Sequence, residues 1–222
     1  MSNDGISNSH TFGATDIPVS RGILVVVSSP SGGGKGTLIR RARKLVPDLG
    51  YSVSFTTRAP REGEIDGQEY FFVSMETFAA MVEAGEFLEW AIVHGNYYGT
   101  ARNQVLRDIS SGRDIILEID VQGAEAVREA ALEAVAIFIL PPSFEVLKSR
   151  LRGRGSEIPD DFALRLRNAR DEVRHFVEFD YVIINDVADR AAGELAAIVI
   201  AERTRTRRQS VWAAKVIETF PT

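Results

Sequence analysis

The sequence predicts an α/β fold in which a mostly parallel sheet is covered by helices on both faces. Short uninterrupted runs of apolar residues, many of them β-branched, are typical of strands buried on both faces. Between these runs, apolar residues recur at the spacing of amphipathic helices. Alternation of the two patterns indicates strand–helix–strand units, whose strands lie parallel.

Apolar runs define the expected strands, and the segments between and around them define the expected helices. The strands are residues 23–27, 114–120, 135–140 and 181–184. The helices are residues 37–46, 101–111, 123–132, 143–152 and 162–179. Ser143 stands at an N-cap position, and Gly112 follows the second helix as a helix-ending glycine.

Three segments break this rhythm. Residues 1–20 are rich in Ser, Asn, Gly and Asp without apolar periodicity, so we expect a flexible leader and a fold that begins near Arg21. Residues 56–98 combine a turn-rich stretch with an alternating run at 87–93, which predicts a small inserted subdomain of mixed structure. The tail, residues 206–222, has no decisive pattern, so its structure is left open.

Composition narrows the function classes. The 222-residue chain is 45% apolar and therefore has the material for a sizeable core. It contains no cysteine, which excludes disulfides, thiolate metal sites and a cysteine nucleophile. The absence of cysteine is compatible with a reducing compartment, and we expect a cytoplasmic location. No apolar run approaches the roughly 20 residues that cross a bilayer, so we expect no membrane partner. The net charge of −5 argues against a general nucleic-acid binder.

The segment Ser28–Thr37, SSPSGGGKGT, joins the first strand to the first helix. Its consecutive glycines let the backbone approach a ligand closely, and the helix N-terminus that follows favours an anion. Lys35 adds a mobile positive charge, as in the phosphate-binding loop GxxxxGK followed by Ser or Thr. Two positions depart from that pattern, because Ser29 replaces the first glycine and Gly36 moves the nearest hydroxyl to Thr37. We predict a site for nucleotide phosphate.

Further segments carry polar and aromatic residues in a distinctive order. They are 51–61 (YSVSFTTRAPR), 67–72 (GQEYFF), 87–90 (FLEW), 95–100 (GNYYGT) and 117–123 (LEIDVQG). Together with the loop, they resemble the guanylate kinase family, whose members convert GMP and ATP to GDP and ADP. The family loop commonly reads GKS or GKG, so Gly36 lies within its range, whereas Ser29 is less usual.

The resemblance covers about residues 21–205 and implies an architecture. Residues 21–55 and 99–205 form a P-loop kinase core, with a five-stranded parallel sheet flanked by helices. Residues 56–98 become a small mixed α/β GMP-binding subdomain. The glycine-flanked arginines of residues about 150–166 become a lid that closes over the polyphosphate.

Guanine presents two neighbouring donors, N1–H and the 2-amino group, and a separate acceptor, O6. The Glu89 carboxylate supplies two acceptors, and the Ser54 hydroxyl can donate to O6. By family correspondence, Glu118 also contacts the guanine edge, Thr100 stands near the base, and Asp120 belongs to the GMP site. The resemblance assigns the GMP phosphate to the side chains of Arg58, Arg61, Tyr70 and Tyr98.

The ATP side follows from the loop and the lid. Asn185 matches an adenine-side position of the family, although the acidic residue usual two places later is Val187 here. Arg154 and Arg165 match lid arginines that reach the transferring phosphoryl group, and Arg150 matches a third. The ATP-binding residues of the loop are Ser29, Pro30, Ser31, Gly32, Gly33, Gly34, Lys35, Gly36 and Thr37.

Phosphoryl transfer needs little covalent chemistry from a protein, since the reactants must be aligned and the charge on the moving group neutralised. No general base is required, because the GMP phosphate is already ionised near neutral pH. We expect Mg²⁺ to bridge the β and γ phosphates, with Thr37 and Asp120 acting directly or through water. The expected catalytic residues are Lys35, Arg58, Asp120, Arg154 and Arg165.

Two alternatives stay open at this point. A related kinase could act on a phosphorylated sugar, but it would not need the guanine-reading residues Ser54, Glu89 and Glu118. A guanylate-kinase-like binding module could have lost catalysis, but such modules usually lack an intact phosphate loop, and this chain keeps Lys35. The sequence does not indicate the oligomeric state.

Overall fold

The structure is a computed structural model of the chain that describes residues 21–93, 95–130, 132–152 and 159–221. The predicted leader, residues 1–20, lies outside the described residues. So does Arg154, together with much of the predicted lid loop.

The main sheet consists of parallel strands in the order β2-β7-β1-β8-β9. The predicted fold class, an α/β fold with a five-stranded parallel sheet, is confirmed. Because β1 lies at the centre, the loop that follows it leaves from the middle of the sheet's carboxyl edge, where ligands of such sheets bind. The strands are β1 Leu24–Ser28, β2 Gly50–Tyr51, β7 Ile115–Glu118, β8 Ala134–Leu140 and β9 Tyr181–Ile184.

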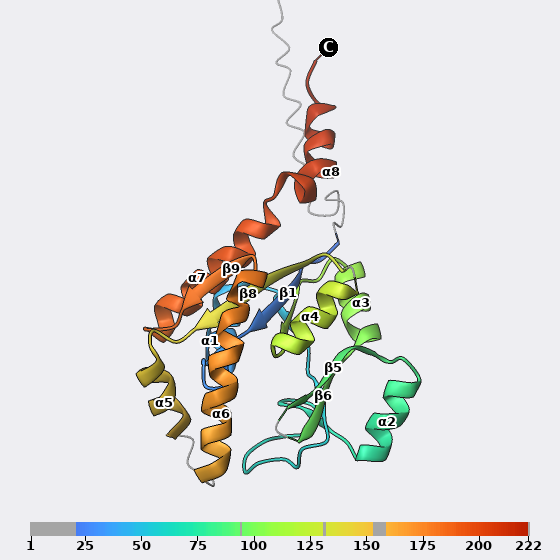
Figure 1. The fold of residues 1–222 in the computed structure, drawn as a ribbon. Helices are drawn as coiled ribbons and strands as arrows, with labels where there is room; N and C mark the ends of the chain where they lie inside the picture. The colour runs from blue at the N-terminus through green and yellow to red at the C-terminus, as the bar shows by residue number, and fades with distance from the viewer. Residues whose placement is uncertain (1–20, 94, 131, 153–158, 222) are drawn as a thin grey trace, which may run out of the picture.

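Helices cover both faces of the main sheet (Figure 1). Alternate residues of β1 point into two cores, since Val25 and Val27 pack with the helices on one face and Leu24 and Val26 with those on the other. The first core contains residues of α1 Lys35–Leu45 and α7 Ala188–Arg203. The second contains residues of α3 Arg102–Ser110 and α4 Val121–Glu129.

The helix bounds differ by a few residues from the sequence-based expectation, most clearly in α4 and α6. Helix α4 begins at Val121 rather than 123, because Asp120 is its N-cap and accepts the Gly123 N–H at 2.8 Å. The helix predicted over 162–179 is α6 Pro159–Glu172, continued by a 3₁₀-helix, η2 Val173–Glu178.

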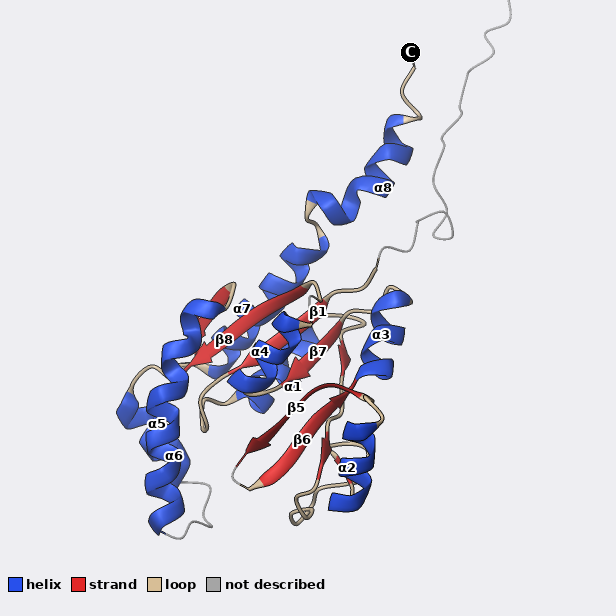
Figure 2. Cartoon of the chain, turned by 45° about the vertical axis from the view of Figure 1, so that its right-hand side comes forward, coloured by secondary structure: helices blue, strands red, loops and turns tan. Residues whose placement is uncertain are grey.

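A second, smaller sheet of mixed direction has the strand order β4-β3-β6-β5 (Figure 2). It includes Phe55 and reaches Ala101, and thus extends past residues 56–98 at both ends, because Phe55 pairs with Gly99. Phe78 is fully buried and stacks on Phe87 with ring centroids 4.5 Å apart. The elements are β3 Phe55–Thr56, β4 Phe71–Phe72, α2 Met75–Glu83, β5 Phe87–Val93 and β6 Asn96–Ala101.

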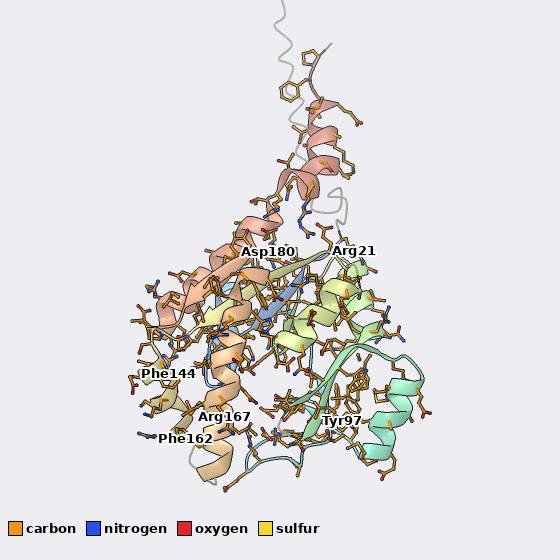
Figure 3. The ribbon with its side chains drawn as sticks, in the orientation of Figure 1. Arg21, Tyr97, Phe144, Phe162, Arg167 and Asp180 are labelled. Carbon is orange, nitrogen blue, oxygen red and sulfur yellow. The ribbon has the colours of Figure 1, made fainter. Side chains whose placement is uncertain are left out.

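Helices α5 Phe144–Arg152 and α6 form an arm with its own small core. Leu147 and Leu151 of α5 pack with Ala169 of α6, apart from the two cores of the main sheet. The predicted N-cap is present, since the Val146 N–H donates to Ser143 Oγ at 3.2 Å. Figure 3 labels Phe144, Phe162 and Arg167 on this arm and Tyr97 on the second sheet, and both parts project from the same side of the main sheet.

The tail forms a further helix, α8 Thr206–Ile217, which projects away from the main sheet on the side opposite the second sheet (Figures 1 and 2). Its base is fastened by the ion pair of Arg207 with Glu133 at 2.6 Å, and by a bond from Arg208 to the Arg21 carbonyl. None of the helices in the described part of the chain is both long and apolar enough to cross a membrane.

Candidate functional site

The glycine loop turns sharply between β1 and α1. Gly32 and Gly34 have φ angles of 84° and 94°, a region that favours glycine, and the Gly33 N–H donates to the Pro30 carbonyl at 2.8 Å. Helix α1 begins directly after the turn, at Lys35. Its unpaired N–H groups therefore face the loop, which is the geometry of a phosphate site.

Ser29 is accommodated without a strained backbone. Its φ is negative, since Asp48 is the one non-glycine residue with a positive φ in the described part of the chain. A Cβ on Gly33 would lie 2.7 Å from both Cβ and Oγ of Ser29, so the serine side chain fills the space beside that glycine. The Lys35 ammonium donates a long hydrogen bond of 3.4 Å to the Ser29 carbonyl.

Asn185 and Arg150 support the other side of the loop. Asn185 Nδ2 donates to the Gly33 carbonyl at 2.8 Å, and Arg150 Nη2 donates to the Asn185 carbonyl at 2.8 Å. Asn185 Oδ1 and Arg150 Nη1 are buried and have no hydrogen-bond partner within the described structure. Buried polar atoms are normally paired, so both atoms are suited to a ligand at this place.

Glu89 lines the same pocket as the phosphate loop and is buried on β5, with 6% of its surface exposed. Thr100 Oγ1 donates to Glu89 Oε1 at 2.5 Å. The register of β5 on β6 shifts between Phe87 and Glu89, a bulge of the kind that redirects side chains beside functional sites. A Cβ on Gly123 would lie 2.6 Å from Glu89 Oε2, so the carboxylate needs glycine at that position.

Burial raises the pKa of Glu89 to about 7, from an ordinary value of 4.5. The hydrogen bond from Thr100 lowers this pKa, whereas the negative charge of Asp120 raises it further. Burial destabilises the charged form of this carboxylate, and a ligand that donates hydrogen bonds to it would stabilise that form.

Glu118, at the end of β7, also lines this pocket. Tyr51 donates to Glu118 Oε2 at 3.3 Å, and burial raises the Tyr51 pKa far above its ordinary value, so the phenol keeps its proton. A Cβ on Gly36 would come within 3.3 Å of Glu118 Oε2, a contact tighter than usual. The absence of a side chain at Gly36 therefore leaves room for this carboxylate.

Arg58 is held by a carboxylate and by aromatic rings. Both oxygens of Glu64 lie 2.9 Å from Arg58 Nη2, and the guanidinium carbon is 5.4 Å from the Tyr70 ring centroid. Partial burial alone would lower the Arg58 pKa, but Glu64 outweighs it and the pKa is raised. Burial raises the pKa of Tyr70 to about 12, and its ring lies edge-on to Tyr98 at 5.7 Å.

One pocket brings most of the predicted residues together, and the others that the structure describes lie outside its lining. Thr100 is buried and contacts Glu89, whereas Arg61 is exposed and donates its backbone N–H to Glu64 at 2.7 Å. Thr37 is exposed and lines a separate hollow on α1. The predicted residues in the lining are Ser29, Pro30, Ser31, Gly32, Gly33, Gly34, Lys35, Gly36, Ser54, Tyr70, Glu89, Tyr98, Glu118 and Asp120.

The model of the guanylate kinase family matches residues 21–202. The chain belongs to this family. A guanylate kinase from Aromatoleum aromaticum is 51% identical over 188 residues, which are 85% of this chain and 92% of the relative. One from Symbiobacterium thermophilum is 49% identical over 200 residues, 90% of this chain and 93% of the relative. The crystal structure of guanylate kinase from Anaplasma phagocytophilum superposes with a TM-score of 0.71 at 36% identity, covering 85% of this chain and 90% of that one.

The kinases of this family are expected to use Mg²⁺ with ATP, so we asked whether the residues of the pocket could hold this ion. Mg²⁺ prefers oxygen ligands and is often held by one or two carboxylates together with substrate phosphates. Asp120 suits this role, because its carboxylate lines the same pocket as the phosphate loop. Asp120 Oδ1 already caps α4, and Oδ2 receives a weak bond of 3.3 Å from Gln122. No group of three or more His, Cys, Asp or Glu side chains in the described residues could hold a metal by itself.

Several residues that support the site are not among those predicted from the sequence. They contact predicted site residues and are Tyr51, Glu64, Gly123 and Glu172. Tyr51 and Gly123 stood inside the segments that carried the resemblance, so their position was a usable signal. Glu64 and Glu172 are visible only through contacts in space.

Proposed function

We propose that the chain transfers the γ-phosphoryl group of ATP to GMP and releases ADP and GDP. The observation that carries this proposal is the pairing, in one pocket, of a glycine loop at a helix N-terminus with a buried carboxylate, Glu89. The first feature suits a polyphosphate, and the second suits a base that offers two adjacent donors.

Guanine is the base that satisfies Glu89. Its N1–H and 2-amino group would donate to the carboxylate, with Ser54 donating to O6 and Glu118, held by Tyr51, meeting the same edge. Adenine has an unprotonated N1, which would place a lone pair against a buried charge. A site of this kind rejects the wrong base by several orders of magnitude.

We assign binding of the GMP phosphate to arginine and tyrosine side chains in and around the second sheet. Arg58 is pre-oriented by Glu64 and stays protonated, while Tyr70 and Tyr98 line the pocket as hydroxyl donors. Arg61 lies beside Glu64 through its backbone and completes the proposed set.

On the ATP side, the proposal assigns the loop N–H groups and Lys35 to the β and γ phosphates, Asn185 to the adenine side, and Arg150 to ATP as a third arginine of the lid. Arg165 and Arg154 neutralise the transferring phosphoryl group, although Arg154 lies outside the described residues. When bound, Mg²⁺ neutralises charge on the β and γ phosphates of ATP. Asp120 would supply protein oxygen to it, and the assignment of Thr37 stays a prediction.

The division into a core (21–55 and 99–205), a GMP-binding subdomain (56–98) and a lid (about 150–166) also stays a prediction, as does the cytoplasmic location. Exclusion of water from the site would limit wasteful ATP hydrolysis, so we expect the subdomain and the lid to close when both nucleotides bind. Small-angle scattering with a bisubstrate analogue should show a smaller radius of gyration. An unchanged radius would contradict closure.

A coupled assay of ADP release tests the proposed function. Turnover with GMP should exceed turnover with AMP or a sugar phosphate by several orders of magnitude, and dGMP measures the tolerance for the ribose. Lys35→Ala should abolish most of this activity. Lys44→Ala is the matched control, because Lys44 is exposed on the same helix. Unchanged turnover in Lys35→Ala would refute the proposed role of the loop.

A further inference from the structure

Ser31, in the middle of the phosphate loop, is held by two side chains of one helix. Its backbone N–H donates to Glu172 Oε2 at 2.9 Å. Its hydroxyl oxygen accepts from Nε and Nη2 of Arg165 at 3.2 and 3.1 Å. Arg165 and Glu172 are two turns apart on α6 and lie on the same face of this helix. Helix α6 therefore hydrogen-bonds both the backbone N–H and the hydroxyl of Ser31.

These contacts orient the arm formed by α5 and α6. The apolar packing of the arm is a separate small core of Leu147, Leu151 and Ala169. The arm also touches the loop at Gly32, where a Cβ would lie 2.9 Å from a Leu151 methyl group. The contacts at Gly32 and Ser31 therefore fix where α6 stands relative to the phosphate loop.

The charge of Glu172 calls for an explanation. This carboxylate lines the same pocket as the phosphate loop. A negative charge in the wall of a polyphosphate site disfavours the ligand by repulsion. Glu172 is nevertheless aimed at a loop N–H that would otherwise face solvent or ligand.

We propose that Glu172 is a positioning residue for phosphoryl transfer: by accepting the Ser31 N–H, it sets the register of α6 on the phosphate loop and thereby the place of Arg165. The inference rests on the proposed function, which assigns Arg165 to the transferring phosphoryl group. The acceptor oxygen is what matters, and the negative charge works against ATP.

Three variants of Glu172 separate these two properties. Glu172→Gln keeps an acceptor oxygen at the same reach and removes the charge, so kcat should stay within about threefold of the parent and the KM for ATP should not rise. Glu172→Ala removes the acceptor, and kcat should fall about tenfold or more, because small misplacements of reacting groups are costly. Glu172→Asp keeps the charge but places the acceptor oxygen too far from the Ser31 N–H, so its kcat should fall as in Glu172→Ala. This variant tests the role of the acceptor if Glu172→Ala folds poorly.

Arg165→Ala, alone and combined with Glu172→Ala, tests whether the effect passes through the arginine. The second substitution should add little, whereas independent roles would multiply the losses. Asp171→Ala, at an exposed neighbouring position on α6, is the matched control and should behave as the parent. Melting temperatures of all variants identify any loss that is due to unfolding.

The outcomes distinguish two kinds of failure. If Arg165→Ala leaves kcat unchanged, the proposed function has assigned that arginine wrongly. If Arg165→Ala is impaired while Glu172→Ala is not, or if Glu172→Gln is as poor as Glu172→Ala, the positioning role is overturned and the proposed function stands.

Discussion

Replacing Glu89 by glutamine is expected to stabilise the protein at pH 8 while it weakens GMP binding. The carboxyl pKa is about 7 in the folded protein and about 4.5 in the unfolded chain. The folded state therefore holds this proton more tightly, and the stabilisation is fully present below pH 4.5 and is lost as the pH rises through 7. The amide carries no charge and can still accept from Thr100, so the variant should not suffer this loss.

The magnitude follows from the two pKa values. Each pKa unit corresponds to about 1.4 kcal/mol, so the full effect is about 3 kcal/mol, of which about 2.5 kcal/mol falls between pH 5 and pH 8. In a chain of this size, 1 kcal/mol shifts Tm by about 2–4 °C. The Tm of Glu89→Gln minus that of the parent should therefore be larger at pH 8 than at pH 5 by roughly 5–10 °C.

Scanning calorimetry of both proteins at pH 5, 6, 7 and 8 measures this difference. Glu86→Gln is the control, because Glu86 is exposed just before the same strand and should show no such trend. A Tm difference between Glu89→Gln and the parent that does not change with pH would refute the argument that burial of this charge is costly.

The same variant should lose GMP selectively. At pH 8 the amide places a donor against one of the guanine donors, which should raise the KM for GMP about 10- to 100-fold and leave the KM for ATP nearly unchanged. Towards pH 6 the parent's Glu89 gains its proton, so the ratio of the two KM values for GMP should shrink. The phosphate of GMP also titrates near pH 6, but it does so equally in both proteins. Equal losses for GMP and ATP would count against the assignment.

Three further substitutions test contacts around the site. Gly33→Ala should raise the KM for ATP several-fold through its clash with Ser29, and adding Ser29→Gly should restore part of it, as measured in a double-mutant cycle. Gly123→Ala should displace the Glu89 carboxylate and weaken GMP binding in calorimetry while ATP binding is kept; equal weakening would contradict the contact. Glu64→Gln should raise the KM for GMP several-fold, because one of two charge-assisted hydrogen bonds to the arginine is lost; an unchanged KM would exclude this role.

The main sheet was predictable because its information is local. Each of its longer strands consists mainly of a continuous apolar run, and the strand at Tyr181–Ile184 has the predicted bounds, although it lies at the edge of the sheet and exposes Val182 and Ile184. The short strands were not predictable in this way, since Gly50–Tyr51 and Phe55–Thr56 contain two residues each and exist through pairing with distant partners. The predicted start of α4 is wrong because the apolar run places Asp120 at the end of a strand, whereas its side chain caps the helix.

In the site, too, some features are indicated by the local sequence and others depend on contacts between distant residues. The glycine loop is a local pattern, and the choice of Glu89 follows from the chemistry of guanine. What directs Glu89 into the pocket is a bulge in β5 and the missing Cβ of Gly123, and neither can be seen without the fold. The contact of Glu172 with Ser31 joins residues 141 positions apart, so no periodicity along the chain could indicate it.

The glycines of the loop are best understood through the neighbours that use the space of their absent side chains. Gly32 is met by Leu151, Gly34 by the Asn185 amide and Gly36 by the Glu118 carboxylate. Gly33 differs, because the group beside it is Ser29 of the loop itself. Ser29 therefore departs from the usual loop pattern without a positive φ, because its buried side chain occupies the space that Gly33, the second glycine of the segment, leaves beside it.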